Sequence, residues 1–316
     1  MSALIALAEI EAARARIAPY VSPTPVLAMN PTGLKLKAEN LTPIGAFKIR
    51  GAFNAMLGLD EAQKAAGVVA HSSGNHAQAV AYVAARLGIK ATVVMPANAP
   101  APKLAGVRRE GAEIVLVGPA AAERSAKARE LADARGLTPI EPFDMEAIMC
   151  GTGTVGLEIL EQAPEVETIF VPVSGGGLLA GVAAAVKLSR PSVRVIGVEP
   201  ALANDAAQSF KAGEIVTITA EETLRTLADG LRVQRLGAKT WPHIRAYVDD
   251  IITVSEAQIT AAMRRIAAET RLIAEPSGAA APAGALAYGG DPRLGVAVVS
   301  GGNIDPKLFA EILMAE

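Results

Sequence analysis

The stretches GAFKIRGA, at residues 45–52, and SSGNHAQ, at residues 72–78, decide how this chain is interpreted. The first sets a single lysine, Lys48, among small and apolar residues, and the second is a turn that carries hydroxyl and amide groups. A buried amine loses part of its preference for the charged form and becomes a nucleophile toward a carbonyl group. The pair predicts a lysine that bonds a carbonyl compound, next to a polar turn that holds what is bound.

The composition of the 316 residues limits the class of protein. The formal net charge is -2 and no basic block stands out, so neither nucleic acid nor an anionic membrane is an expected partner. A single cysteine, Cys150, excludes a disulfide within the chain and favours a reducing compartment. No basic region precedes the first apolar residues, and no apolar run approaches the roughly 20 residues of a membrane span. We expect a cytoplasmic protein without a signal peptide.

Short β-branched runs alternate with longer alanine-rich segments. The expected strands are residues 67–70, 91–95, 114–117, 169–173, 193–198, 251–254 and 296–299. The expected helices are residues 77–87, 120–135, 155–162, 178–188, 256–270 and 278–288. Several of the strands are apolar throughout, as strands covered on both faces should be. The alternation predicts an α/β fold with largely parallel, twisted sheets.

Glycine-rich turns punctuate the ends of three expected strands, at Gly74, residues 175–177 and residues 301–302. Ligands of open α/β sheets collect at the carboxyl ends of strands, so a cleft built from distant segments is expected. SGGGL, at residues 174–178, lies between a strand and a helix, where backbone N–H groups and the helix dipole favour a phosphate. The loop lacks the Gly-Lys-Ser/Thr ending of a nucleotide P-loop.

Together these motifs resemble the serine/threonine dehydratase and serine racemase family of pyridoxal-phosphate enzymes, which have the tryptophan-synthase-β fold, called fold type II. The resemblance extends over nearly the whole chain through ADG at 228–230, TWP at 240–242, VDDI at 248–251 and EPSGA at 275–279. It implies a large cofactor-binding domain made of residues 1–54 and 146–316, and a small mobile domain of residues 55–145. It also implies a homodimer.

The resemblance implies a role for each residue of the cofactor site. Lys48 would form the Schiff base, Phe47 would pack on the ring, Asn75 would bond the ring hydroxyl and Ser300 would face the ring nitrogen. The phosphate would lie on the loop of Ser174, Gly175, Gly176, Gly177 and Leu178. Because a neutral serine does not enforce a protonated ring, the cofactor would favour elimination or proton exchange over transamination.

The turn at residues 72–78 is expected to hold the substrate. The candidates for binding its carboxylate are Ser72, Ser73, Asn75, His76 and Arg124, although Arg124 could equally be an exposed helix arginine and Asn75 a helix cap. The resemblance places Ser73 on the face of the cofactor opposite Lys48. Two acid–base groups on opposite faces permit racemisation, whereas one permits elimination alone, so Ser73 leaves both reactions open.

A divalent cation is expected near residues 199–205. Glu199 and Asp205 could supply carboxylates, and the Ala203 carbonyl and water could complete the shell of Mg²⁺, Ca²⁺ or Mn²⁺. Two acids at this spacing are common in solvated loops, but the resemblance to the racemase branch implies a cation that stabilises the large domain away from the chemistry.

The leading hypothesis is an ammonia-lyase that converts L-serine or L-threonine to a 2-oxo acid and ammonia. The alternatives are a serine racemase that interconverts L- and D-serine and a 3-hydroxyaspartate dehydratase. A non-catalytic binding protein and a β-replacement enzyme fit the motifs less well, because His76 after Asn75 and IRG after Lys48 are typical of the dehydratase group. Val233 and Thr152 depart from the pattern of the racemases and leave the substrate open.

Overall fold

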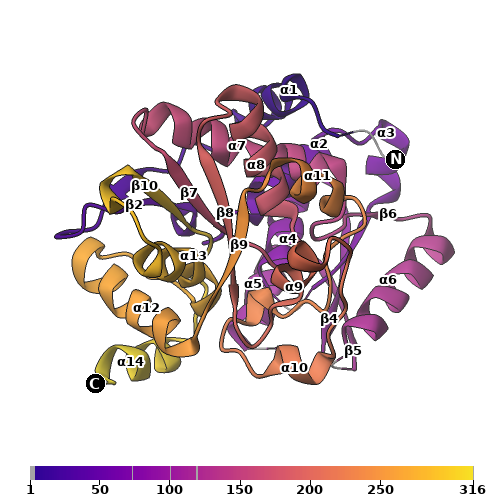
Figure 1. Cartoon of the computed structure of the whole chain (residues 1–316). Helices are drawn as coiled ribbons and strands as arrows, with labels where there is room; N and C mark the ends of the chain where they lie inside the picture. Colours follow the sequence, from indigo (N-terminus) through magenta and orange to yellow (C-terminus); the bar gives the residue numbers. More distant parts are fainter. Residues whose placement is uncertain (1–3, 73, 100, 119, 316) are drawn as a thin grey trace.

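The protein folds around two separate sheets (Figure 1). The computed structural model describes residues 4–72, 74–99, 101–118 and 120–315. One sheet has six strands in the order β1-β2-β10-β7-β8-β9, and the other has four in the order β5-β4-β3-β6. All strand pairs in these ranges are parallel except β1 with β2. The predicted α/β class with largely parallel sheets is confirmed.

The larger sheet takes its strands from both ends of the chain. They are β1 (Val26–Ala28), β2 (Lys35–Ala38), β7 (Thr168–Pro172), β8 (Arg194–Pro200), β9 (Asp250–Val254) and β10 (Gly295–Val299). The three central strands, β10, β7 and β8, are buried along almost their whole length because helices cover both faces. This burial explains their continuous apolar sequences.

The smaller sheet comes from one continuous part of the chain. Its strands are β3 (Val68–His71), β4 (Ala91–Pro96), β5 (Glu113–Val117) and β6 (Thr138–Pro139). The helices that connect them are α4 (Asn75–Leu87), α5 (Ala101–Arg109) and α6 (Ala121–Arg135). This unit lies beside the larger sheet in Figure 1, and the chain enters and leaves it once.

The remaining helices pack on the larger sheet, connect its strands, or lead from it to the smaller sheet. They are α1 (Leu7–Ile17), α2 (Lys48–Leu57), α3 (Glu61–Ala66), α7 (Glu146–Gln162), α8 (Gly177–Ser189), α9 (Asp205–Ala212), α10 (Ala220–Leu224), α11 (Thr240–Tyr247), α12 (Glu256–Thr270), α13 (Pro276–Ala287) and α14 (Pro306–Met314). Helices α1, α7 and α8 pack on one face of the sheet, and α12 and α13 pack on the other. Short 3₁₀ turns are η1 (Glu39–Leu41), η2 (Asp229–Leu231) and η3 (Pro292–Leu294). None of the helices in the described ranges is long and apolar enough to span a bilayer.

Helix α7 begins at Glu146, nine residues before the expected start of the helix at Val155. Its first half contains glycines, which are typical of a turn. In the fold these glycines allow close helix packing: a Cβ at Gly151 would lie 2.6 Å from the Arg50 carbonyl oxygen, and one at Gly156 would lie 3.0 Å from the Val182 carbonyl oxygen. The glycines of α7 are therefore packing residues.

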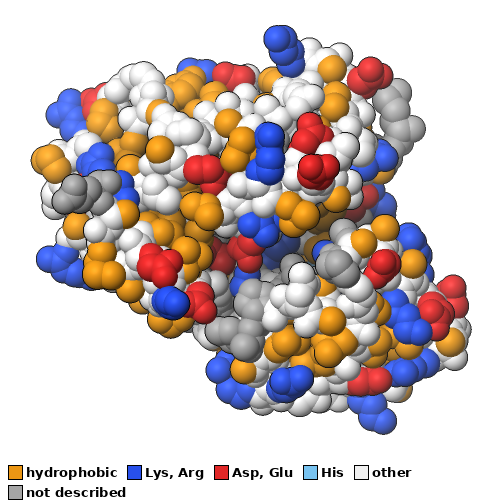
Figure 2. Space-filling view, turned by 90° about the horizontal axis from the view of Figure 1, so that it is seen from below, with side chains coloured by type: hydrophobic (Ala, Val, Ile, Leu, Met, Phe, Trp, Pro, Cys, Tyr) orange, Lys and Arg blue, Asp and Glu red, His pale blue; other side chains and the backbone are white. Residues whose placement is uncertain are grey.

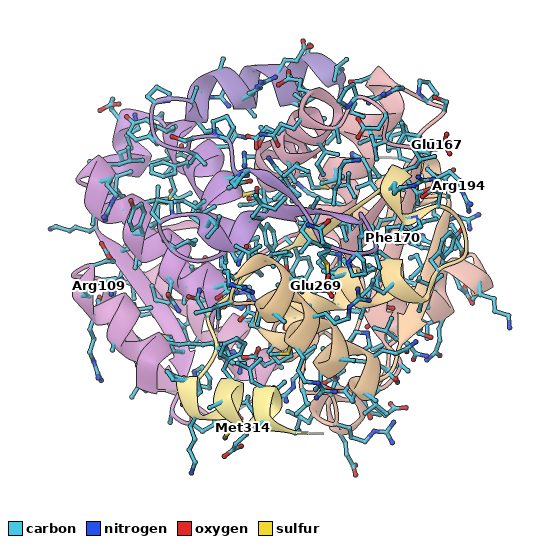
Figure 3. The ribbon with its side chains drawn as sticks, turned by 90° about the vertical axis from the view of Figure 1, so that its left-hand side faces the viewer. Arg109, Glu167, Phe170, Arg194, Glu269 and Met314 are labelled. Carbon is cyan, nitrogen blue, oxygen red and sulfur yellow. The ribbon has the colours of Figure 1, made fainter. Side chains whose placement is uncertain are left out.

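The two ends of the larger sheet differ in composition. At the amino end, Glu167, Phe170 and Arg194 lie close together (Figure 3), and the ring of Tyr288 lies 5.2 Å from that of Phe170. The glycine-rich turns at residues 175–177 and 301–302 lie at the opposite, carboxyl end. The glycine-rich turns are therefore gathered at the carboxyl end of the sheet.

Candidate active site

A pocket lies where the carboxyl ends of the two sheets face each other, and Figure 2 shows the surface hollowed between two masses of the molecule. Of the site residues expected from the sequence, the pocket is lined by Phe47, Lys48, Ser72, Asn75, His76, Arg124, Ser174, Gly175, Gly177, Leu178 and Ser300. Gly176 lies within the same loop, and Ser73 falls outside the described residues. The fold thus brings together segments that lie far apart in the chain, at its beginning, middle and end.

Lys48 is the first residue of α2 and lies in the wall of this pocket. The Phe47 N–H donates to the Ser300 carbonyl at 3.0 Å, which ties the start of α2 to the end of β10. The Lys48 ammonium donates to the Pro142 carbonyl at 2.5 Å and lies 5.0 Å from the centre of the Phe47 ring. Desolvation lowers the pKa of Lys48 to about 8, so this amine is a better nucleophile than an ordinary lysine.

The loop of residues 174–177 has the geometry of an anion site. It connects β7 to the N-terminus of α8, whose first N–H groups have no partners within the helix. Ser174 and Gly176 have positive φ values of 57° and 94°. A Cβ at Gly175 would lie 2.5 Å from the ring of Phe143, and the Thr240 hydroxyl donates to the Gly175 carbonyl at 2.8 Å. The glycines are thus required by close packing as well as by conformation.

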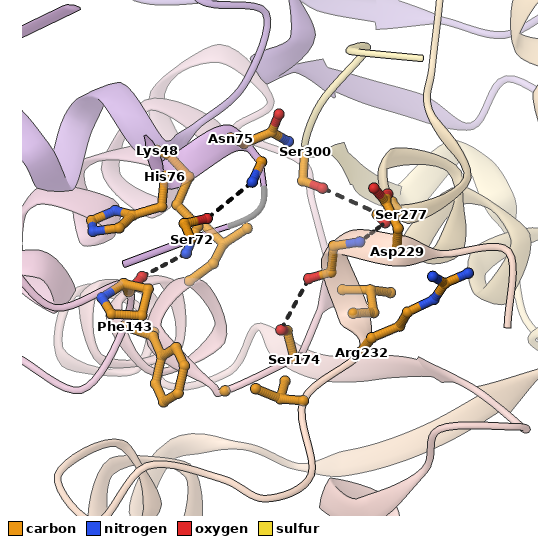
Figure 4. A pocket seen from close by; sticks show the side chains of 18 of the residues that line it. Lys48, Ser72, Asn75, His76, Phe143, Ser174, Asp229, Arg232, Ser277 and Ser300 are labelled. Carbon is orange, nitrogen blue, oxygen red and sulfur yellow. Dashed lines mark hydrogen bonds between the residues drawn. The ribbon is translucent and has the colours of Figure 1, made fainter. Parts of the chain in front are cut away.

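Hydrogen bonds link the loop to the opposite wall of the pocket (Figure 4). The Ser174 hydroxyl donates to the Gly230 carbonyl at 3.1 Å, and the Gly230 N–H donates to the Ser277 hydroxyl at 2.8 Å. Ser300, which follows β10, is buried, and its hydroxyl lies 3.5 Å from the Ser277 carbonyl oxygen. Three loops of the larger sheet therefore hold one another in place around the pocket.

His76 is buried on the side of the pocket that belongs to α4. Its Nε2 lies 2.8 Å from the Ile140 carbonyl, which is an acceptor, so Nε2 carries the proton. Burial, with a smaller effect of Lys48, lowers the pKa of His76 to about 3. The imidazole therefore stays neutral at ordinary pH, and it can contact a substrate only as an uncharged group.

The charged residues of the pocket that the sequence interpretation did not assign to the site include Lys103, Asp229 and Glu275. Lys103 on α5 forms an ion pair with Asp229 in η2, so this contact joins the two sheet units. Glu275 is buried and accepts from the Asn75 side-chain amide at 2.6 Å. Desolvation, and next the charge of Asp229, raise the pKa of Glu275 to about 7. In the sequence Asp229 and Glu275 stand in the motifs ADG and EPSGA, whereas nothing distinguished Lys103.

The expected cation residues lie away from the pocket, at the end of β8 and the start of α9. Glu199, Ala203 and Asp205 are all fully buried. The Glu199 carboxylate accepts from the Ala207 N–H at 2.9 Å, whereas neither oxygen of Asp205 has a hydrogen-bond partner among the described residues. Desolvation and then Asp205 raise the pKa of Glu199, and desolvation raises that of Asp205 to about 7. Within the described ranges, no cluster of three or more His, Cys, Asp or Glu residues could hold a metal.

The pocket matches a known family. A family model described as "Pyridoxal-phosphate dependent enzyme" matches residues 17–301. This chain belongs to the pyridoxal-phosphate dependent enzymes. The predicted cofactor, pyridoxal phosphate, is thereby supported, and the pocket of this enzyme has features that fit it: a desolvated amine, a phosphate-sized glycine loop at a helix N-terminus, and a buried hydroxyl at Ser300.

Its relatives include both racemases and ammonia-lyases. The serine racemase of Oryza sativa subsp. indica is 44% identical over 96% of this enzyme and 92% of its own length. The L-threo-3-hydroxyaspartate ammonia-lyase of Pseudomonas sp is 40% identical over 88% of this enzyme and 87% of its own length. A solved structure of maize serine racemase has 41% identity and a TM-score of 0.90 over 98% of this enzyme and 97% of that chain. The expected fold type II and the expected group of lyases and racemases are confirmed.

Proposed function

We propose that the enzyme removes water from a hydroxy amino acid, L-serine or L-threonine, and releases a 2-oxo acid and ammonia. The observation that supports this most directly is the pairing of a desolvated lysine, Lys48, with a neutral hydroxyl, Ser300, across one pocket. Because the residue at the end of β10 is a serine and not a carboxylate, a permanently protonated cofactor ring, and hence transamination, is disfavoured.

Each wall of the pocket would hold one part of the cofactor and the substrate. The loop of residues 174–178 would bind the phosphate through backbone N–H groups, and Phe47 would pack on the ring. Ser72 and backbone N–H groups of the turn, that of Asn75 included, would bind the substrate carboxylate, joined by Arg124 from the side of α6. The cationic and neutral polar groups of these positions suit an anion.

Lys48 would be the group that moves the proton. Bound pyridoxal phosphate supplies an electron sink that makes the α-proton of an attached amino acid acidic. The neutral amine of Lys48 would take the proton from the α-carbon of the substrate. A pKa near 8 leaves a useful neutral fraction of this amine at ordinary pH.

Racemisation of serine is the second candidate. It is favoured by the serine at position 73, for which the resemblance to the racemase group implies an acid–base role opposite Lys48. The similarity to the rice serine racemase supports it further. A 3-hydroxyaspartate substrate is a third possibility, supported by the similarity to the Pseudomonas ammonia-lyase.

We also propose that a divalent cation, Mg²⁺ or alternatively Ca²⁺ or Mn²⁺, binds Glu199, Asp205 and the Ala203 carbonyl. The unsatisfied Asp205 carboxylate supports this, because buried carboxylates are otherwise paired with a cation or hydrogen-bonded. Residues 55–145 as a mobile domain, a homodimer and a cytoplasmic location remain predictions from the sequence and the resemblance.

A product assay tests the proposed reaction. Purified enzyme would be supplied with L-serine, D-serine, L-threonine and 3-hydroxyaspartate, with and without Mg²⁺, and 2-oxo acid and enantiomer would be measured separately. We expect 2-oxo acid from at least one hydroxy amino acid, and none from a Lys48→Ala variant. A wild-type protein that stays colourless after addition of pyridoxal phosphate would contradict the proposal.

A Ser73→Ala variant separates the two reactions. If Ser73 exchanges a proton on the second face, racemisation should fall by about tenfold or more while elimination changes little. Equal survival of both activities would show that a different group serves the second face.

A further inference from the structure

Asn75 belongs to a hydrogen-bond network of three side chains that come from different segments of the protein. The Asn303 side-chain N–H₂ donates to the Asn75 Oδ1 at 2.9 Å, and the Asn75 Nδ2 donates to the Glu275 Oε1 at 2.6 Å. Asn303 follows the Ser300 turn, Asn75 starts α4, and Glu275 precedes α13. Asn75 and Glu275 both line the active-site pocket, where Figure 4 places Asn75 beside Lys48 and Ser300.

Asn303 determines the direction of every hydrogen bond in this network. Asn303 also donates to the Ile44 backbone carbonyl at 2.8 Å, and a carbonyl can only accept. The N–H₂ side of Asn303 must therefore face both Ile44 and Asn75. The atom of Asn75 that it meets must be the oxygen, so the Asn75 N–H₂ side faces Glu275 and the pocket.

The surrounding backbone packs closely against these three side chains. A Cβ at Gly45 would lie 2.6 Å from the Asn303 Oδ1, and Gly45 has a φ of +70°. A Cβ at Gly301 would overlap the Glu275 Oε1 and would lie 3.1 Å from the Asn75 Nδ2. Glycines therefore flank the hydrogen-bond network at both ends, and a side chain at either glycine would displace the residues of the network.

We infer that Asn303 and Glu275 are positioning residues that hold the Asn75 amide with its N–H₂ side toward the pocket. One N–H of this group bonds Glu275, and the second is left to donate to an electronegative atom of whatever lies in the pocket. The inference rests on the proposed function, since the acceptor it implies is an oxygen on the ring of pyridoxal phosphate. Without this hydrogen-bond network, the Asn75 amide could turn by about 180° and present its oxygen to that acceptor. The two oxygens would then repel each other.

Glu275 suits this role as a buried acceptor. Its second oxygen, Oε2, has no hydrogen-bond partner among the described residues, so Oε1 with Asn75 is the contact that holds it. The charged groups that face Glu275 are Asp229 from η2 and Lys103 from α5, which form an ion pair with each other. Glu275 can accept from Asn75 whether it is protonated or ionised. The hydrogen bond between the two residues therefore forms both below and above the pKa of Glu275.

The inference is tested by the affinity and absorbance of the bound cofactor, which do not depend on turnover. Asn303→Asp replaces the donor by an acceptor, so Asn75 should turn its N–H₂ side toward residue 303. We expect binding of pyridoxal phosphate to weaken by about tenfold or more, the size of one lost hydrogen bond to a charged group. We also expect a smaller visible band relative to the near-ultraviolet band. Asn303→Ala, which only frees the amide, should show the same changes in milder form.

A double-mutant cycle distinguishes positioning from a general structural effect. If Asn303 acts through Asn75, then Asn75→Ala alone and Asn75→Ala with Asn303→Asp should bind the cofactor equally weakly. Additive losses would overturn the inference. Asn40→Ala is the matched control, because Asn40 also donates to a backbone carbonyl nearby, that of Ile273 at 2.8 Å, without touching Asn75. Its cofactor absorbance should equal that of the wild type.

Glu275 is tested in the same way. Glu275→Gln keeps an oxygen that accepts from Asn75, whereas Glu275→Ala removes it, so the glutamine variant should bind the cofactor more tightly than the alanine variant by about fivefold or more. Equal affinities of the two variants would contradict the role of Glu275. A wild-type protein that binds no pyridoxal phosphate would instead overturn the proposed function, so the two failures are distinguishable.

Discussion

Two regions of the larger sheet bury charged side chains, and they do so in opposite ways. Beneath α2, Lys37 and Arg50 meet Glu39 and Glu158, so two cations face two anions and all four are at most 4% exposed. At the end of β8, Glu199 and Asp205 are equally buried, but both are anions. In the first group the opposite charges balance, whereas the second has no balancing cation among the described residues.

The balanced cluster is built around the fork of Arg50. The guanidinium donates to both oxygens of Glu39 and of Glu158, at 2.6–2.9 Å. Although burial acts to raise the pKa of Glu39, the charge of Arg50 holds it below its ordinary value. In the unbalanced pair the pKa values are raised instead, because desolvation exceeds the effect of the backbone hydrogen bonds and no cation among the described residues acts on the pair. The comparison indicates that burial alone does not tell a structural charge from a ligand site; the local charge balance does.

The largest effect is expected when the balanced cluster is broken. Arg50→Met leaves two buried carboxylates with only Lys37 nearby, so the free energy of unfolding should fall by about 3–5 kcal/mol. Urea denaturation followed by circular dichroism measures this change. A loss below about 1 kcal/mol would mean that water or a rearranged lysine compensates the carboxylates.

The second-largest effect is expected when a cation is added to the pair of Glu199 and Asp205. Mg²⁺ at about a hundred times its dissociation constant should stabilise the wild-type enzyme by about 2.7 kcal/mol. The thermal midpoint should therefore rise with Mg²⁺ in the wild type and stay constant in Asp205→Asn. A shift of equal size in both proteins would place the cation elsewhere.

Without a cation, the same pair should make stability depend on pH. The folded-state pKa of Asp205, about 7, lies above its ordinary value of 3.8, so the folded protein holds a proton that the unfolded chain releases. Stability is therefore fully present below about pH 4 and is lost as the pH rises through about 7. The amide of the Asp205→Asn variant cannot ionise, so at about pH 8 with a chelator this variant should be more stable than the wild type by about 1–3 kcal/mol. Thermal melts below and above the pKa, at about pH 5 and about pH 8, compare the two proteins.

The smallest effect belongs to an exposed pair, which serves as the reference for both regions. Arg14 on α1 and Glu161 on α7 form a bidentate ion pair with side chains 40% and 56% exposed. Arg14→Met should change the free energy of unfolding by less than about 1 kcal/mol, because solvent screens the pair. A loss as large as that of Arg50→Met would show that burial is not what distinguishes the two.

The sequence predicts those parts of the site that depend on local chemistry. Lys48 and the loop of residues 174–178 stand in short motifs whose residue types indicate their function, and the central strands are recognisable by continuous apolar runs. Strand β2 was missed because Lys35 and Lys37 interrupt its pattern. The buried ammonium of Lys37 is paired with the carboxylate of Glu158, a residue 121 positions away.

Contacts between residues so far apart in the sequence cannot be predicted from the spacing of residues within a motif. Lys103 and Asp229 are 126 residues apart, and Asn75 and Asn303 are 228 residues apart. The sequence around each of these side chains gives no sign of the contact, because the contact depends on a partner from another segment. The strand ends could be predicted to converge, but the pairs that form between them follow from the three-dimensional register of the two sheets.

The lowered pKa of Lys48 has a consequence for how an emptied enzyme regains its cofactor. At pH 7 an amine with a pKa of about 8 is neutral in roughly a tenth of the molecules, whereas one at 10.5 is neutral in about one in three thousand. Capture of an aldehyde by the empty pocket should therefore accelerate with pH and level off above about pH 8. Stopped-flow absorbance of the apoenzyme mixed with pyridoxal phosphate would follow this rate. The burial of Lys48 is thus also expected to affect the rate at which the apoenzyme binds pyridoxal phosphate.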